Sequence, residues 1–185
     1  MIIIGHLGIT LFFCAPLANA LVTSGHRVEV SRWVGIALVV TMVPDADLYL
    51  PWVTHRGLTH SLLAAVCLGV IVAAVVTVRW RDPLASSKDY IRRARLGFTV
   101  GAGSVVSHLL GDVITPMGIR PFNPADSIYS LNLVYANNLE ANLACMVIGV
   151  VVFSIVYRRS KDPMPTGRAT ASDLATESEV RLFNP

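Results

Sequence analysis

Four side chains in this sequence have types and spacings that suit metal binding. His108 and Asp112 are four residues apart, so on a helix they project from one face, one turn above the other, and can hold the same ion. Asp45 and His60 would complete a set of two nitrogen and two oxygen ligands, which zinc accepts. Because no thiolate is expected nearby, zinc is favoured over softer metals, and Mn²⁺ and Fe²⁺ remain alternatives.

Three further ionisable side chains, those of His6, Asp47 and His55, accompany these candidate ligands. A charged group at the centre of a membrane helix costs about 2.5–3.5 kcal/mol on insertion scales, so such a gathering needs a shared partner. Taken singly, the histidines could anchor at the membrane surface, Asp45 could cap a helix, and the His108–Asp112 pair could be a structural hydrogen bond. Their convergence on one membrane face favours a metal site that includes His6 and His55.

Three residues are candidates for catalytic roles beside the metal. Asp47, two residues from Asp45, can act as a base or orient a ligand histidine. Arg56 and Arg120 are near the ligands in sequence, and a guanidinium binds phosphate or carboxylate through two parallel hydrogen bonds. These arginines predict an anionic substrate; the alternative is an ion pair with Asp47 or Asp126, or anchoring at the membrane surface.

The composition excludes a water-soluble globular protein. Of 185 residues, 54% are hydrophobic and 15% are charged, and the mean hydropathy is +0.59, whereas soluble domains carry about a quarter charged residues. Long uncharged stretches match the roughly 17–25 residues that cross a bilayer. We therefore predict an all-α multi-pass membrane protein, a bundle of about five transmembrane helices at about 2–24, 33–50, 59–80, 95–114 and 139–157.

Alternating helices place every candidate ligand at one end of this bundle. Thirteen of the fifteen Lys and Arg residues fall at the opposite end, namely Arg27, Arg32, Arg79, Arg81, Lys88, Arg92, Arg93, Arg95, Arg158, Arg159, Lys161, Arg168 and Arg181. By the positive-inside rule, the protein lies in the cell membrane with its N-terminus and metal site outside and its C-terminus in the cytoplasm. A cleaved signal peptide at 1–20 is less favoured, because its N-terminal region has no Lys or Arg.

The remaining features concern organisation. We expect a transmembrane helical domain at 1–157 and a disordered cytoplasmic tail at 158–185, which is rich in Pro, Ser, Thr and charge. The 115–138 linker has three prolines and could lie over the site as a lid. Thr59 is the expected N-cap of the third helix, and the three cysteines are expected to be apolar core residues.

Several short strings carry a resemblance to a known family. They are HRGLTHS at 55–61, HLLGDVITPMG at 108–118, PDAD at 44–47 and Pro121-Phe122. In these strings the chain resembles the YdjM-like family of inner-membrane proteins, which are regarded as metal-dependent hydrolases, over about residues 1–155.

The order His, Asp, His, HxxxD is more distantly similar to the ligand order of secreted zinc-dependent phospholipases C and single-strand-specific zinc nucleases. That resemblance implies that Asp45, His60, His108 and Asp112 hold one zinc, with His6 and a bridging Asp112 serving a second. Those enzymes use later histidines for further zinc, and this chain has none after His108. The resemblance therefore implies one or two metal ions in this chain.

Together these features predict a membrane-embedded metal-dependent hydrolase that uses metal-activated water. Its expected substrate is an anionic phosphoester or phospholipid at the outer membrane face, with membrane lipid as partner; nothing in the chain resembles a nucleic-acid-binding module. The alternative is a noncatalytic metal-binding membrane protein. That would be an adaptor using the basic 81–95 segment, or a metal transporter, which would need ligands near the bilayer midplane.

Overall fold

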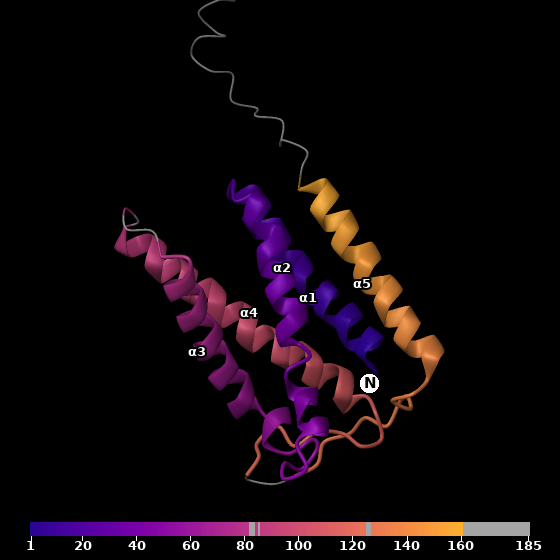
Figure 1. Ribbon diagram of the computed structural model, residues 1–185. Coiled ribbons are helices and arrows are strands. Elements are labelled where there is room, and N and C mark those ends of the chain that lie inside the picture. Colours follow the sequence, from indigo (N-terminus) through magenta and orange to yellow (C-terminus); the bar gives the residue numbers. More distant parts are fainter. Residues whose placement is uncertain (82–83, 85, 125–126, 161–185) are drawn as a thin grey trace, which may run out of the picture.

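The described residues form a bundle of five α-helices (Figure 1). The computed structural model describes residues 1–81, 84, 86–124 and 127–160. The helices are α1 (Ile3–Thr23), α2 (Val30–Val40), α3 (Leu62–Arg79), α4 (Ser87–Val113) and α5 (Leu139–Arg159), joined by three 3₁₀ helices, η1 (Arg27–Glu29), η2 (Pro44–Tyr49) and η3 (Leu58–His60). The described residues form no strand beyond one isolated bridge between Ile119 and Tyr129. The predicted all-α architecture is confirmed.

Four of the helices, α1, α3, α4 and α5, are long and apolar enough to cross a membrane. Their outer surfaces carry large apolar side chains that are more than half exposed, such as Val70 and Ile71 on α3 and Val147 and Ile148 on α5. Water would disfavour such surfaces, whereas lipid tails match them. The chain is therefore a membrane protein, as its composition predicts.

The helices pack as two close pairs around a short central helix. In Figure 1, α2 lies between the α3–α4 pair and the α1–α5 pair, and both pairs have extensive contacts. Glycines permit the close approach: a Cβ at Gly149 would lie 2.0 Å from the Gly8 carbonyl oxygen, and a Cβ at Gly101 would lie 2.9 Å from Gly69 Cα. Small residues at helix contacts are the usual way in which membrane helices pack.

The predicted second helix, 33–50, is wrong as a single element. The helix α2 has 11 residues and rises only about 16 Å, and η2 continues the chain after a turn at Thr41–Val43. Pro44 explains the break, because it has no N–H to donate to Val40 four residues earlier and its ring clashes with that carbonyl. The break places Asp45 in the first turn of η2.

The predicted start of the fourth helix is also wrong, whereas that of the third is correct to within a few residues; side-chain caps set both. The fourth helix begins at Ser87 rather than near 95, because Ser86 and Asp89 form a reciprocal capping box. The third begins at Leu62, with Ser61 rather than Thr59 as its N-cap: the Ser61 hydroxyl accepts a hydrogen bond from the Ala64 N–H at 3.1 Å. Thr59 is thereby left available for other contacts.

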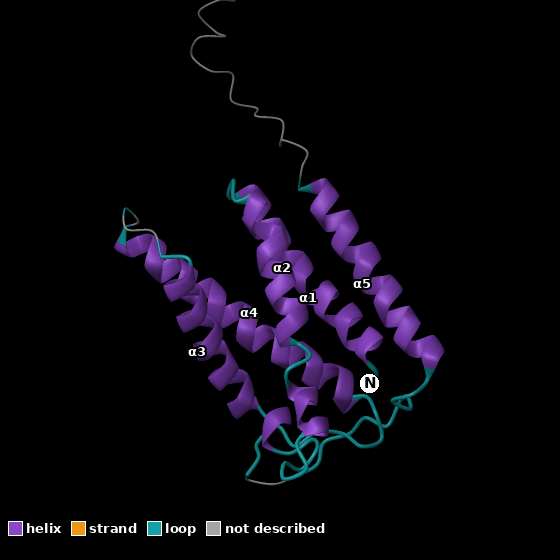
Figure 2. Ribbon diagram, viewed as in Figure 1, coloured by secondary structure: helices purple, strands orange, loops and turns teal. Residues whose placement is uncertain are grey.

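Most of the loops gather at one end of the bundle, which also holds η2 and η3 and which we call the site end (Figure 2). The 115–138 segment crosses this end and is tied to the helices. The Leu62 N–H donates to the Pro121 carbonyl at 2.8 Å, and the Leu131 N–H donates to the Val113 carbonyl at 2.7 Å. The predicted tail from 161 onward lies outside the described residues.

Candidate metal centre

Four potential ligand atoms converge at the site end, one each from Asp45, His60, His108 and Asp112, which we call the four-ligand set. Three elements position them: η2 carries Asp45, the last residue of η3 is His60, and α4 carries His108 and Asp112 one turn apart. The sequence pattern HxxxD works here as predicted, because its two side chains leave the same face of a helix.

The separations within the four-ligand set match those of a tetrahedral ion. His60 Nε2 lies 3.2 Å from His108 Nε2, and both nitrogens lie 3.4 Å from Asp45 Oδ1 and from Asp112 Oδ2. Zinc holds nitrogen and oxygen ligands at about 2.0–2.2 Å, so neighbouring ligand atoms of a tetrahedron stand about 3.3–3.6 Å apart. Asp112 Oδ2 has no hydrogen-bond partner among the described residues. The four-ligand set can therefore hold a metal ion.

The four-ligand set is largely buried. The side chains of His60, His108 and Asp112 are at most 1% exposed, and that of Asp45 is 19% exposed. Burial alone would raise the pKa of Asp45, but hydrogen bonds with His108 and His60 outweigh it and hold this pKa well below the usual range. Two carboxylates so close together balance the charge of a divalent cation.

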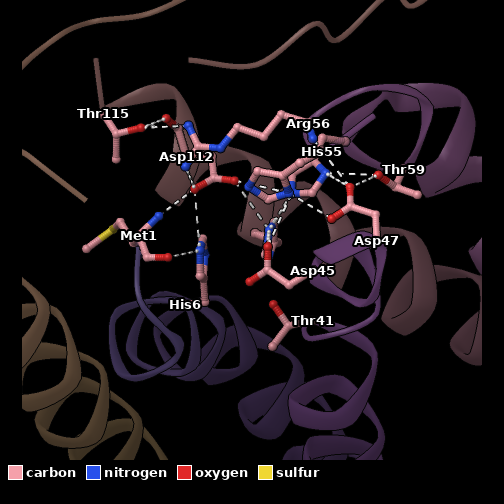
Figure 3. Close-up of polar contacts among 12 residues, drawn as sticks. Met1, His6, Thr41, Asp45, Asp47, His55, Arg56, Thr59, Asp112 and Thr115 are labelled. Atoms are coloured by element: carbon pink, nitrogen blue, oxygen red, sulfur yellow. Dashed lines mark hydrogen bonds and ion pairs between the residues drawn. The ribbon is translucent and has the colours of Figure 1, made fainter. Parts of the chain in front are cut away.

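Asp47 contacts His60 at Nδ1, whereas Asp45 and Asp112 face its Nε2; Figure 3 shows Asp47 beside Thr59. Its Oδ2 lies 3.3 Å from His60 Nδ1 and accepts a hydrogen bond from the Thr59 hydroxyl at 2.5 Å. Burial opposes ionisation of Asp47, but the bonds from Thr59 and His55 dominate and lower its pKa. An ionised Asp47 keeps the proton of His60 on Nδ1 and leaves Nε2 free as a metal ligand.

His55 joins Asp47 and His60 in a second group of possible ligands. His55 Nδ1 lies 2.7 Å from Asp47 Oδ1, and the His55 ring is part-exposed, 5.2 Å from the ring of His60. The structure thus brings His55 beside the four-ligand set rather than into it. The same Asp47 that orients His60 also fixes the ring of His55.

His6 reaches the centre from α1 but is not one of the four. Its ring is fully buried and stacks on that of His108, with ring centroids 3.8 Å apart. Its Nε2 lies 3.5 Å from Asp112 Oδ1 and 3.1 Å from the Met1 carbonyl oxygen. His6 therefore fixes the plane of His108 beside Asp112 and lies outside the four-ligand set.

Arg56 is buried in the site, with its guanidinium bonded to the protein. Its Nη2 donates to Asp112 Oδ1 at 2.8 Å, and its Nη1 donates to the Thr115 hydroxyl at 2.9 Å and the Gly118 carbonyl at 3.0 Å. The backbone of Arg56 has a φ of 59°, a conformation that such bonds must hold in place. Arg56 thus ties Asp112 to the 115–138 segment. Its guanidinium pairs with Asp112, whereas the predicted partner Asp47 accepts only the backbone N–H of Arg56, at 3.3 Å; the other predicted partner, Asp126, lies outside the described residues.

Arg120 lines a small cavity of about 140 Å³ at the site end together with Arg56 and His55; its other walls are Thr54, Met117, Gly118, Ile119 and Ile128. The two arginines that the sequence singles out therefore do share one cavity. Arg56 and His55 form the wall between this cavity and the four-ligand set, because Arg56 bonds to Asp112 and His55 bonds to Asp47.

Several residues of the centre were missed by the sequence reasoning. Thr59 and Thr115 hold Asp47 and Arg56 in place, and both fall inside the strings that carry the family resemblance, which is the only signal that marks them. Asn142 of α5 accepts a hydrogen bond from the Ile2 N–H at 3.2 Å, and the Met1 amine lies 2.5 Å from Asp112 Oδ1.

A layer of buried hydroxyls lies along the membrane-spanning part of the bundle, next to His108. The Thr10 hydroxyl bonds to those of Thr41, at 2.9 Å, and Ser107, at 2.8 Å. The Thr41 hydroxyl donates to the Ser104 carbonyl at 3.2 Å. These bonds join α1, the end of α2 and α4, and so fix the helix that carries His108 and Asp112 against its neighbours.

The chain was compared with known proteins at three levels. No curated protein and no solved structure gave a match. The family model described as "YdjM inner membrane protein" matches residues 1–180, which include every residue of the four-ligand set and of its surroundings. The chain therefore belongs to the YdjM inner membrane protein family.

Proposed function

We propose that this protein is a membrane-embedded metal-dependent hydrolase that acts on an anionic phosphoester, of the phospholipid type, at the outer membrane face. The observation that carries the proposal is the four-ligand set, whose nitrogen and oxygen atoms have the spacing of a tetrahedral ion. Zinc is the metal that this ligand set suits best, with one or two ions per chain, and Mn²⁺ or Fe²⁺ as alternatives.

A divalent metal bound there would supply an acidified water, with a pKa lowered towards about 7, and a Lewis acid for the phosphoryl oxygen. The chain itself supplies the arrangement around it. Asp47 holds the proton of His60 on Nδ1 through a contact of 3.3 Å. Arg56 donates a hydrogen bond to Asp112 Oδ1, and Asp112 Oδ2 faces His60 and His108.

Arg120, with His55, is the part of the centre that we assign to the anionic group of the substrate. Both line the same cavity as Arg56, and His55 is 30% exposed, so its ring can meet a ligand from outside. Arg56 contributes positive charge to this wall, while its Nη1 and Nη2 hydrogen bonds serve Asp112, Thr115 and Gly118. We assign direct contact with the substrate to Arg120 because it lines this cavity and its side chain is part-exposed.

The place of the centre supports a lipid substrate. The four-ligand set lies at one end of helices that are apolar enough to cross a membrane. Apart from Arg56 and Arg120, the Lys and Arg residues of the described helices and loops lie towards the other end, which the positive-inside rule assigns to the cytoplasm. In that orientation the centre stands at the outer boundary between membrane and water. Phosphoesters of membrane lipids are presented at that depth, whereas soluble cytoplasmic metabolites are not.

A second candidate function is a noncatalytic metal site. One observation favours it: the four protein ligands can complete a tetrahedron, and closed four-ligand sites are typical of structural zinc. Against it, two of the four ligands are carboxylates, and Asp45 is 19% exposed. An open coordination position, reached on the side of Asp45, would distinguish the hydrolase from the structural site.

The test is zinc-dependent turnover by the detergent-purified protein, screened against phosphodiesters, phosphomonoesters and amides. We expect phosphoester hydrolysis that a chelator abolishes and added zinc restores. His26→Ala serves as the matched control for His108→Ala, because His26 lies between α1 and α2, at the end of the bundle opposite the site end. Stoichiometric bound zinc without turnover of any of these substrates would favour the noncatalytic site.

A further inference from the structure

An apolar groove of about 310 Å³ lies beside the four-ligand set, between the η2 and η3 segments and α3. Its lining residues are Val43, Pro44, Leu58, Thr59, Leu63, Ala64, Cys67 and Leu68. The two 3₁₀ segments form the end near the metal centre, and successive turns of α3 form the wall that leads away from it. The exposed position of Cys67 corrects the expectation that all three cysteines are core residues.

The chemistry of the groove selects a hydrocarbon. Among the described residues that line it, Thr59 alone carries a hydroxyl or charged group, and that hydroxyl already donates to Asp47 at 2.5 Å. A polar ligand would lose its hydrogen bonds with water on entering such a groove. A flexible apolar chain loses none.

The groove is continuous with the metal centre on one side and with the membrane-facing surface on the other. Pro44 and Thr59 immediately precede the ligands Asp45 and His60, and Asp45 is the most exposed of the four ligands. On the outer side, Leu63 and Leu58 are both more than half exposed. These side chains belong to the surface that we assign to lipid, so a lipid chain can enter the groove without crossing water.

We propose that this groove holds one acyl chain of a membrane phospholipid while the phosphoester of the same molecule lies at the four-ligand set. The inference rests on the proposed function and deepens it, because it names the lipid chain as part of the substrate. Lipid tails are as apolar as the groove, so transfer of the chain from the bilayer adds little affinity. The groove orients the substrate, and it discriminates against phosphoesters that have no chain.

Cys67 provides a direct test, because a free thiol lines the groove and a second one, Cys145 on α5, lies outside it. The zinc-loaded protein in detergent is treated with N-ethylmaleimide, and modification of each cysteine is followed by peptide mass spectrometry. The probe is a dialkyl phosphonolipid, which cannot be cleaved at the phosphoester. At about ten times its Kd, the probe should slow modification of Cys67 roughly tenfold, since only unoccupied protein reacts, and leave Cys145 unchanged.

Two variants that each introduce a tryptophan ring complete the test. Cys67→Trp fills the groove, whereas Val66→Trp adds the same ring at a half-exposed position of α3 that does not line it. We expect Cys67→Trp to lower kcat/KM for long-chain phospholipid, to leave turnover of a chainless phosphodiester unchanged and to retain bound zinc. Val66→Trp should behave as the wild type in all three measurements.

The outcomes separate this inference from the proposed function. Protection of Cys67 without turnover of any phosphoester would support the lipid groove and refute the hydrolase. Hydrolysis of phospholipid with no protection of Cys67, or with equal protection of Cys67 and Cys145, would refute the groove and leave the hydrolase standing. Equal protection by the headgroup phosphonate without chains would also refute it.

Discussion

Replacement of Asp47 by Asn tests how the metal centre is organised, because it removes a charge without removing a ligand. Asp47 Oδ2 receives the Thr59 hydroxyl, the Arg56 N–H and the contact with His60 Nδ1. Because three donors face the Oδ2 position, the amide oxygen of Asn must occupy it. The NH₂ group then takes the Oδ1 position, which lies 2.7 Å from His55 Nδ1. Neutral His55 can accept that hydrogen bond, and the local geometry is thus retained.

The expected loss follows from the charge alone. Hydrogen bonds to an ionised group are roughly twice as strong as neutral ones, and Asp47 is 2% exposed, so solvent screens it little. Carboxylates that orient a ligand histidine typically contribute 10–100-fold to metal affinity. We expect Asp47→Asn to weaken zinc binding by about that factor, or roughly 1.4–2.7 kcal/mol, which is less than removal of a ligand costs.

The assay is a zinc titration of detergent-purified protein against a competing chelator. Asp89→Asn is the matched control, because Asp89 is an exposed capping carboxylate at the other end of α4; its zinc affinity should equal that of the wild type. A folded Asp47→Asn protein whose zinc affinity stays within about twofold of the wild type would refute the assignment of Asp47 to His60.

Three further predictions concern the arginines, the orientation and the pH dependence of stability. Arg56→Lys should lower the Tm by roughly 5 °C, because it loses about two buried hydrogen bonds of about 1 kcal/mol each, whereas Arg120→Lys should keep its bound zinc but lose kcat/KM towards anionic substrates; an unchanged Tm in Arg56→Lys or an unchanged kcat/KM in Arg120→Lys would contradict these roles. In intact cells, a cysteine at Ser127 should react with an impermeant thiol reagent and one at Lys88 should not; reversed labelling would overturn the outward-facing site. Burial alone would raise the pKa of Glu29, but hydrogen bonds from Trp33 and Arg92 outweigh burial, and the pKa in the folded protein is lowered. The ionised Glu29 therefore stabilises the fold fully above the usual pKa of about 4.3. This stabilisation is lost as the pH falls through the lower pKa of the folded protein. The Tm difference between wild type and Glu29→Gln should therefore be constant at neutral pH and shrink in acid; a difference that grows in acid would contradict it.

The sequence was most informative where one physical constraint dominates. Uncharged runs long enough to span a bilayer located α1, α3 and α5 to within a few residues. The spacing of His108 and Asp112 predicted a shared helix face, and the alternation of helices predicted that Asp45 and His60 would meet them. Each of these inferences needs only helix geometry and the direction of the chain.

The sequence was least informative where side chains compete for the backbone or for one another. Hydropathy does not register Pro44, which ends α2, or the Ser86–Asp89 capping box, which extends α4 through a charged segment. The partner of Arg56 also depends on how η3 and the 115–138 segment meet in space. For that reason the charge of Arg56 was recognised, but its bond to Asp112 was not.

The most direct test of the central claim is the amount of zinc that the purified protein binds per chain. The wild type should bind at least one zinc ion, and replacement by Ala of any one of Asp45, His60, His108 and Asp112 should lower this amount steeply, because an incomplete set loses affinity. His26→Ala should bind as much zinc as the wild type. A well-folded protein with both His108→Ala and Asp112→Ala that retains the full amount of zinc would contradict the proposed centre.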